Sequence, residues 1–248
     1  MPSDSMLDKW HALGIFPTIF PRPALIHFFS VFAGEDLSAL RQLNLQELLT
    51  KLKARDDVQN RILQLIAEQP IYKDVNFLYA WGKAFWDLPG CTTGCLKMRF
   101  YAVVLDAHGQ IVAESANRRM TECFGGDRFC TKNGCIRNTQ ASRTDAAIGD
   151  CGHAPLWCLS KLWGHGYQKG DLETLKIFEA GFYVPDFKPW ISDDINYTCV
   201  QCQNEFAIFG VKSIFGVKYV NGVAQWVELP TSDNFYRTAQ YAQGKKKA

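Results

Sequence analysis

The sequence predicts an α/β protein, because segments with helical periodicity and segments typical of strands both occur along the chain. Between Leu45 and Leu52, apolar residues recur at i, i+3, i+4 and i+7, as on one face of an amphipathic helix. Apolar runs of strand length lie at 99–105 and 211–220. Asn221-Gly222 then joins the second run to another at 223–229, which is the strongest short signal of a β-hairpin.

Residues 1–90 are predicted to form a separate, mainly helical module. A second amphipathic pattern, at 58–66, indicates another helix in this part of the chain. The aromatic-rich segments 16–32 and 77–86 fit either strands or buried helices. Leu88-Pro89-Gly90 contains strong turn formers, so the module is expected to end there.

Residues 91–248 are predicted to form the second domain. It opens with a hairpin whose strands, 99–105 and 110–114, flank a turn, and a long loop or insertion at 118–150 follows. A helix is then expected from near His153 to Trp163, followed by a helix at 171–180 that Gly181 stops and a strand at 182–184. The next helix is expected to run from the N-cap Thr198 to Phe209. The closing hairpin and a terminal helix at 232–243 complete the domain.

Composition places the chain among ordinary globular proteins, with 47% hydrophobic and 21% charged residues. A net charge of +2 gives no global electrostatic case for nucleic acid. No apolar stretch approaches the ~18 residues that a membrane span needs, and residues 1–5 lack the features of a signal peptide. We therefore expect a soluble, cytoplasmic protein without membrane contact, whose nine cysteines are thiols or metal ligands more readily than disulfides.

One pattern points to a metal site. Cys199-Val200-Gln201-Cys202 is a Cys-x-x-Cys clip, and His153 adds a nitrogen ligand. Zinc prefers such thiolate and imidazole ligands, and catalytic zinc sites keep three protein ligands and one open position. The clip alone fits equally a redox pair, a structural zinc knuckle or two unrelated thiols, and His153 alone fits a buried structural histidine. Cys91, Cys95, Cys123, Cys130, Cys135 and Cys151 are either scattered thiols or a second, structural zinc site.

The flanking residues resemble the cytidine deaminase-like superfamily, which includes cytidine, deoxycytidylate and tRNA-adenosine deaminases. Residues 100–117 resemble its opening hairpin, and 199–216 resemble its zinc helix and the strand that follows. The resemblance implies a three-layer α/β/α sandwich around a mixed sheet, with the last two strands antiparallel as in the cytidine-deaminase branch. It also implies Zn²⁺ held by His153, Cys199 and Cys202, and a contact between Asn117 and the substrate ribose, although Asn117 also fits a residue that caps the hairpin.

The chain departs from the family at one catalytic position. His153-Ala154-Pro155 stands where zinc deaminases have His-x-Glu, and that glutamate is the proton shuttle. Proline cannot transfer protons. Either the domain has lost catalysis, or Glu205 or Asp150 supplies the acid, or the native glutamate has been replaced in this chain.

The resemblance thus implies a hydrolytic deaminase, weakened or inactive, for an amino-substituted nucleobase in a nucleoside, nucleotide or nucleic acid. The alternative is a non-catalytic binding subunit with a structural zinc, which recruits a partner or nucleic acid. An unrelated α/β domain with a thiol pair is a third possibility. By the same resemblance we expect a homo-oligomer or a partner of an intact deaminase.

Overall fold

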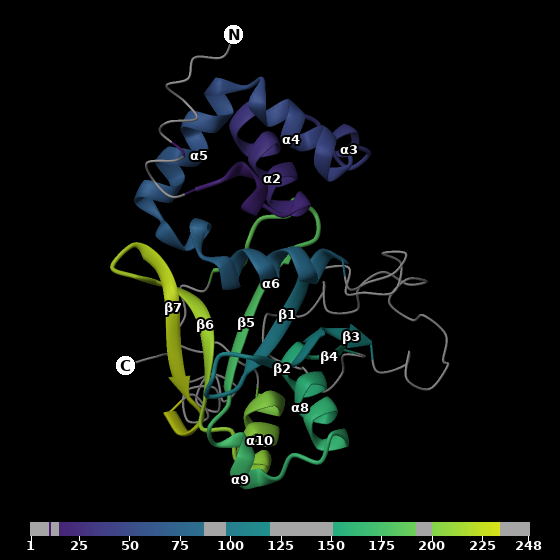
Figure 1. Ribbon diagram of the computed structural model, residues 1–248, viewed down its shortest axis with the longest axis vertical. Helices are drawn as coiled ribbons and strands as arrows, with labels where there is room; N and C mark the ends of the chain where they lie inside the picture. The colour runs from purple at the N-terminus through teal and green to yellow at the C-terminus, as the bar shows by residue number, and fades with distance from the viewer. Residues whose placement is uncertain (1–9, 11–14, 87–97, 120–150, 192–199, 234–248) are drawn as a thin grey trace.

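A single mixed β-sheet organises the molecule (Figure 1). The computed structural model describes residues 10, 15–86, 98–119, 151–191 and 200–233. The five strands lie in the order β2-β1-β5-β6-β7, and only β5 and β6 run parallel. Their bounds are β1 Met98–Leu105, β2 Ile111–Ala116, β5 Lys176–Tyr183, β6 Ser213–Val220 and β7 Val223–Pro230. A separate pair joins β3 Arg118–Arg119 to β4 Cys151–Gly152.

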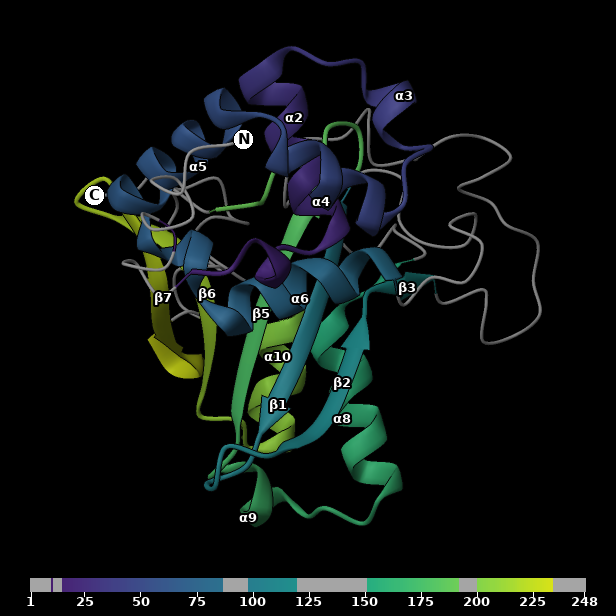
Figure 2. The ribbon, with the colours of Figure 1, turned by 45° about the horizontal axis from the view of Figure 1, so that its top comes forward.

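Helices pack against both faces of this sheet (Figure 2). The longer helices are α2 Arg22–Ala33, α4 Leu45–Lys53, α5 Asp56–Glu68, α6 Val75–Trp86, α8 Ala154–Gly164 and α10 Val200–Phe209. The short ones are η1 Pro17–Ile19, α3 Leu37–Leu40, η2 Pro70–Lys73 and α9 Lys169–Leu172. Helix α6 covers one face, where its side chains share a core with α2, α4 and α5. Helices α8 and α10 cover the other face and form a second core with it.

The two predicted amphipathic helices are confirmed as α4 and α5. Asn44 caps α4 by accepting a hydrogen bond from the backbone N–H of Glu47, and the Glu47 carboxylate accepts one from the N–H of Asn44 in return. The two ambiguous aromatic segments contain helices, α2 and α6. Every residue of α2 from Pro23 to Phe29 is buried, which explains why no polar stripe marks it in the sequence.

The helix predicted at 171–180 is wrong. Helix α9 ends at Leu172, and 176–183 form the central strand β5. Gly181 lies inside that strand, paired with Phe100, and does not end a helix. A Cβ atom on Gly181 would lie 2.3 Å from the carbonyl oxygen of Arg99, so the close approach of the two backbones requires glycine here.

The closing hairpin is confirmed. Asn221 and Gly222 have φ angles of 52° and 79°, the left-handed conformation that a type I′ turn requires. The hairpin 99–114 is also confirmed, as β1 and β2. Residues 231–233 are helical, whereas the rest of the predicted terminal helix, the N-cap Thr198 and residues 120–150 of the predicted 118–150 loop lie outside the described residues.

The boundary predicted near residue 90 stays a prediction, because 87–97 lie outside the described residues. Within the described part, the N-terminal helices and one face of the sheet share a continuous hydrophobic core. In that part of the chain, no helix is long and apolar enough to cross a membrane.

Candidate functional site

The centre of the candidate site is a close pair formed by His153 and Cys202. The imidazole Nδ1 lies 2.8 Å from the Cys202 sulfur, although 49 positions separate the two residues. His153 is the N-cap of α8 with extended backbone, and its side chain makes no capping hydrogen bond. Cys202 lies in the first turn of α10 and is 1% exposed. The fold therefore brings together two of the three residues that the sequence singles out as metal ligands.

Local pairing explains how His153 reaches this position. Strand β3 follows the β1–β2 hairpin directly, and its pairing with β4 holds the two residues that precede His153. Helix α8 then begins at Ala154, with Pro155 in its first turn, as predicted. The N-termini of α8 and α10 thus meet at the pair, where their dipoles favour a thiolate over a thiol.

The donor atoms fit zinc. With Zn–N near 2.0 Å and Zn–S near 2.3 Å, two ligands of a tetrahedral ion stand roughly 3.5 Å apart. The observed 2.8 Å is a hydrogen-bond separation, so a shift of less than about 1 Å would open the pair to metal geometry. Cys199 lies outside the described residues, and among the described ones no group of three His, Cys, Asp or Glu side chains is arranged to hold a metal.

Pro155 and Glu205 each follow one member of this pair closely in the chain. Pro155 is buried in the first turn of α8. Glu205 lies on α10, three residues after Cys202, and is partly exposed. Asp150 lies outside the described residues.

The side chain of Asn117 is hydrogen-bonded to the backbone of strand β1. Its side-chain oxygen accepts a hydrogen bond from the Phe100 N–H at 2.9 Å, and its amide nitrogen donates to the Met98 carbonyl at 3.1 Å. The side chain is 6% exposed. These bonds give Asn117 the capping role at the end of the hairpin, and a contact with ribose stays a prediction.

Sequence reasoning missed two features on the same face of the sheet. Glu179 is a buried carboxylate on β5, hidden because 171–180 were predicted to be helical. The rings of Phe100 and Trp190 form an edge-to-face pair with centroids 5.2 Å apart, and both side chains are partly buried. The ring of Phe100 lies across Gly181, whose missing side chain leaves room for it. The signal for Glu179 was a single charge within an apolar run.

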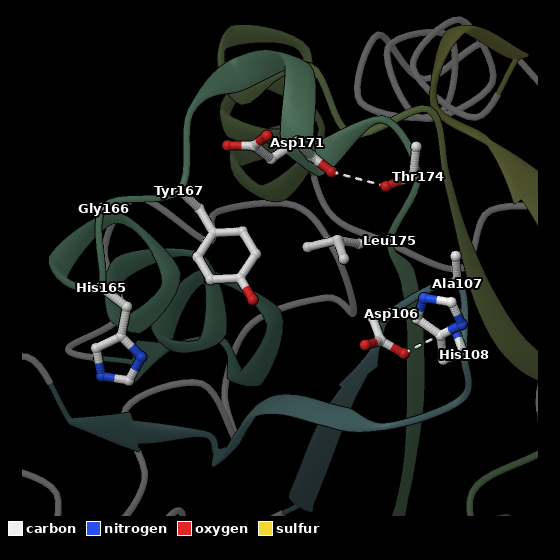
Figure 3. A pocket seen from close by; sticks show the side chains of 9 residues that line it. All are labelled: Asp106, Ala107, His108, His165, Gly166, Tyr167, Asp171, Thr174 and Leu175. Atoms are coloured by element: carbon white, nitrogen blue, oxygen red, sulfur yellow. Dashed lines mark hydrogen bonds between the residues drawn. The ribbon is translucent and has the colours of Figure 1, made fainter.

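A cleft of about 440 Å³ lies at the opposite end of α8 from His153 (Figure 3). The acidic side chains that line it accept hydrogen bonds from backbone N–H groups close to them in the chain. The Asp106 carboxylate accepts hydrogen bonds from the N–H groups of His108 and Gln110, and that of Asp171 accepts one from Gln168. These bonds stabilise a turn and a helix start, so we assign no chemistry to this cleft.

Comparison with known proteins gives no relative. No family model matches the chain, and neither does any curated protein or any solved structure.

Proposed function

We propose that this protein is a zinc-dependent hydrolytic deaminase-like protein for an amino-substituted nucleobase. The observation that carries the proposal is the 2.8 Å contact between His153 Nδ1 and Cys202 Sγ. Two residues that the Cys-x-x-Cys spacing and the resemblance indicate as metal ligands converge at the N-termini of two helices. Thiolate and imidazole are the ligands that zinc prefers.

The arrangement of the elements supports the same proposal. The hairpin, the histidine helix, the cysteine helix and its following strand occur in the order that the resemblance implies. Helices on both faces of a mixed sheet agree with a three-layer α/β/α sandwich. The last two strands are antiparallel, as in the cytidine-deaminase branch.

In this proposal His153, Cys202 and Cys199 hold the ion. When bound, zinc supplies an activated water molecule to the ring carbon. In the overall reaction a C–O bond forms and the C–NH₂ bond breaks. One proton of water ends on the ring nitrogen, and the other leaves with the amine as ammonia. The chain must therefore provide ring orientation and a group that carries protons.

The aromatic pair suits the orientation of a flat heterocycle. Rings stack on or against aromatic faces, and the Phe100 and Trp190 rings lie on the same sheet face as the His153–Cys202 pair. Asn117 bonds the backbone of Phe100 through both its side chain and its own N–H, which fixes the position of that strand. We propose that the Phe100–Trp190 pair holds the base, and that Asn117 holds Phe100 in place through these backbone hydrogen bonds.

A deaminase also needs a group that carries protons to the ring nitrogen and the departing amine. General acid–base catalysis typically contributes ~10²–10⁴-fold, so its loss at Pro155 would leave a weak enzyme. Glu205 is the surrogate that the sequence suggests, one turn beyond Cys202. Proline at position 155, which cannot carry protons, is also the observation that favours the alternative, a non-catalytic binding subunit in which zinc is structural.

Elemental analysis tests the metal site. We expect about one zinc per chain in protein purified without chelator, and loss of that zinc in His153→Ala and Cys202→Ala. Cys158→Ala is the matched control, because Cys158 is equally buried but donates its S–H to the Ala102 carbonyl instead of facing His153. Zinc absent from the unmodified protein, or unaffected by both ligand substitutions, would refute the proposal.

Ammonia release separates an enzyme from a binding subunit. Zinc-loaded protein is incubated with cytidine, deoxycytidine, adenosine and their monophosphates, beside Pro155→Glu. Release by the unmodified protein supports catalysis. Release only by Pro155→Glu supports a binding subunit built on an intact deaminase site.

A further inference from the structure

The 184–188 turn, which follows β5, is held by two side chains of the N-terminal helices. Three successive backbone carbonyl oxygens, at 184–186, accept hydrogen bonds from them. Arg41, the C-cap of α3, donates to the first two at 3.1 and 2.9 Å, and His27 of α2 donates to the third at 3.2 Å. Figure 1 shows this turn as the green segment between β5 and α2. It is therefore fixed by residues that lie 143 to 159 positions earlier in the chain.

Phe187 gives this turn an uncommon backbone conformation. Its φ is 57°, in the left-handed region that residues other than glycine seldom adopt, and such a conformation persists only where the surrounding contacts hold it. The side chain of Phe187 is 4% exposed, and its ring lies 5.7 Å from that of Phe182. The guanidinium carbon of Arg41 stands 4.9 Å from the centroid of the same ring. Arg41 thus holds both the backbone of the turn and its buried aromatic side chain.

The turn determines where Trp190 lies. The N–H of Tyr183 donates to the carbonyl oxygen of Lys188 at 2.8 Å, and the N–H of Trp190 donates to that of Gly181, also at 2.8 Å. These bonds fold the chain back along the end of β5. Phe187 belongs to the core that the N-terminal helices share with the sheet, whereas Trp190 packs against the core of α8 and α10. The turn therefore carries one aromatic side chain to each core, and a displacement of the first would displace the second.

Trp190 is connected in turn to the metal pair. Its ring meets that of Phe100 edge to face, with centroids 5.2 Å apart. The carbonyl oxygen of Phe100 accepts a hydrogen bond from the N–H of Asn117 at 3.0 Å. Strand β3 follows Asn117 directly, and it pairs with β4, which directly precedes His153. A continuous series of contacts therefore runs from Arg41 through the Phe100–Trp190 pair to His153.

We propose that Arg41 is a positioning residue of this site, which holds the 184–188 turn and thereby sets the place of the Trp190 ring beside Phe100. The inference rests on the proposed function, in which the Phe100–Trp190 pair holds the nucleobase. Arginine suits this role because its planar guanidinium donates in several directions and stacks on an aromatic ring, whereas the lysine ammonium is a point charge. Arg41 is exposed, so we expect its substitution to leave both cores intact. The proposal gives the N-terminal helices a function in ligand binding.

Fluorine NMR tests whether Arg41 sets the place of the Trp190 ring. The full chain is labelled with fluorinated tryptophan, and Trp190→Phe identifies the Trp190 signal among the seven. We expect Arg41→Ala to shift this signal, because the ring moves relative to Phe100. Arg41→Lys should shift it in the same direction, since an ammonium does not reproduce the planar contacts. Arg55→Ala is the matched control and should leave the signal in place, because the Arg55 guanidinium pairs with two carboxylates of the N-terminal helical region.

Amide hydrogen exchange tests the turn itself. The N–H groups of Tyr183 and Trp190 are bonded within the folded-back segment, so we expect Arg41→Ala to accelerate their exchange by about ten-fold. The N–H of Asn117, which is bonded to Phe100 outside this segment, should keep its rate. Equal acceleration of all three amides would show a general loss of stability and would overturn the positioning role.

Nucleotide binding gives the functional readout. Cytidine and adenosine monophosphates are titrated into the labelled protein, and at least one should shift the Trp190 signal. Arg41→Ala should raise the Kd of that nucleotide by about ten-fold, since a base stacked on an aromatic ring gains affinity from the ring's position. Arg55→Ala should leave this Kd unchanged.

The outcomes separate the positioning role from the proposed function. A Trp190 signal that neither nucleotide shifts, or a Kd that Arg41→Ala leaves unchanged, would overturn the positioning of a base-holding pair. One zinc per chain with a Trp190 signal indifferent to Arg41→Ala would overturn the role of Arg41 alone. Zinc absent from the unmodified protein would instead overturn the proposed function itself.

Discussion

At the scale of single residues, His27 links the N-terminal helices to the segment that follows β5. Its Nδ1 donates to the carbonyl oxygen of Asp186 at 3.2 Å, and its side chain is 9% exposed. Burial lowers the pKa of His27 from its usual 6.5, and the neighbouring Lys188 acts in the same direction, while the bond to Asp186 opposes them. Folding therefore favours the neutral form of this imidazole over the charged one.

This burial predicts a dependence of stability on pH. Below pH 6.5 the unfolded chain binds a proton at His27 that the folded chain resists, so the free energy of unfolding should fall as pH decreases towards the lowered folded pKa. Urea unfolding at several pH values between pH 5 and 8 measures how steeply the free energy of unfolding changes with pH. His27→Gln should remove this part of it. Equal slopes for the unmodified protein and His27→Gln would contradict the prediction.

At the scale of elements, Gly181 sets how closely β5 lies against β1. Because an added Cβ would stand 2.3 Å from the backbone oxygen of Arg99, we expect Gly181→Ala to lower the free energy of unfolding by about 1–3 kcal/mol. Gly170→Ala is the matched control, since nothing lies within 4 Å of its Cβ position, and it should be nearly neutral. Denaturant unfolding of both variants measures the difference in their free energy of unfolding. Equal stability would show that β1 and β5 can move apart without loss of free energy.

The same strand shows what the sequence could and could not predict. The hairpin at Asn221-Gly222 and the helix α4 were predictable because turn chemistry and amphipathic spacing are local properties. Strand β5 was not, because a central strand buried on both faces has no polar alternation, and Gly181 suggested a helix end. Assigning 171–180 to a helix concealed the charge of Glu179 within the sheet.

The candidate site, like the fold, could be predicted only in part from the sequence. The Cys-x-x-Cys spacing and the family resemblance indicated His153 and Cys202, and the fold brings them within 2.8 Å. The Phe100–Trp190 pair could not be seen in the sequence, because the two residues come from distant segments and the Phe100 ring lies in the space that a side chain at Gly181 would fill. Contacts that depend on strand pairing cannot be derived from one segment at a time.

At the scale of the whole molecule, one core joins the N-terminal helices to the sheet. Phe77 of α6 is fully buried, and its ring lies 6.5 Å from that of Trp226 on β7. The indole N–H of Trp226 also donates to the Asp74 carboxylate, and Gln69 bonds the backbone of the β6–β7 hairpin at two points. The helical region and the sheet are thus tied together at several separate places.

This shared core predicts a single cooperative unfolding transition for the described parts of the chain. Phe77→Ala should lower the free energy of unfolding by about 3–5 kcal/mol and shift the whole transition, because its ring packs between helix and sheet. Phe16→Ala removes an equal ring that is 54% exposed and should change stability by less than about 0.5 kcal/mol. Calorimetry and near-ultraviolet circular dichroism follow the transition. If Phe77→Ala split the melt into two steps and left the later one in place, the N-terminal helices would be an independent domain. A single shifted step would mean that the sheet beneath His153 and Cys202 depends on those helices for its stability.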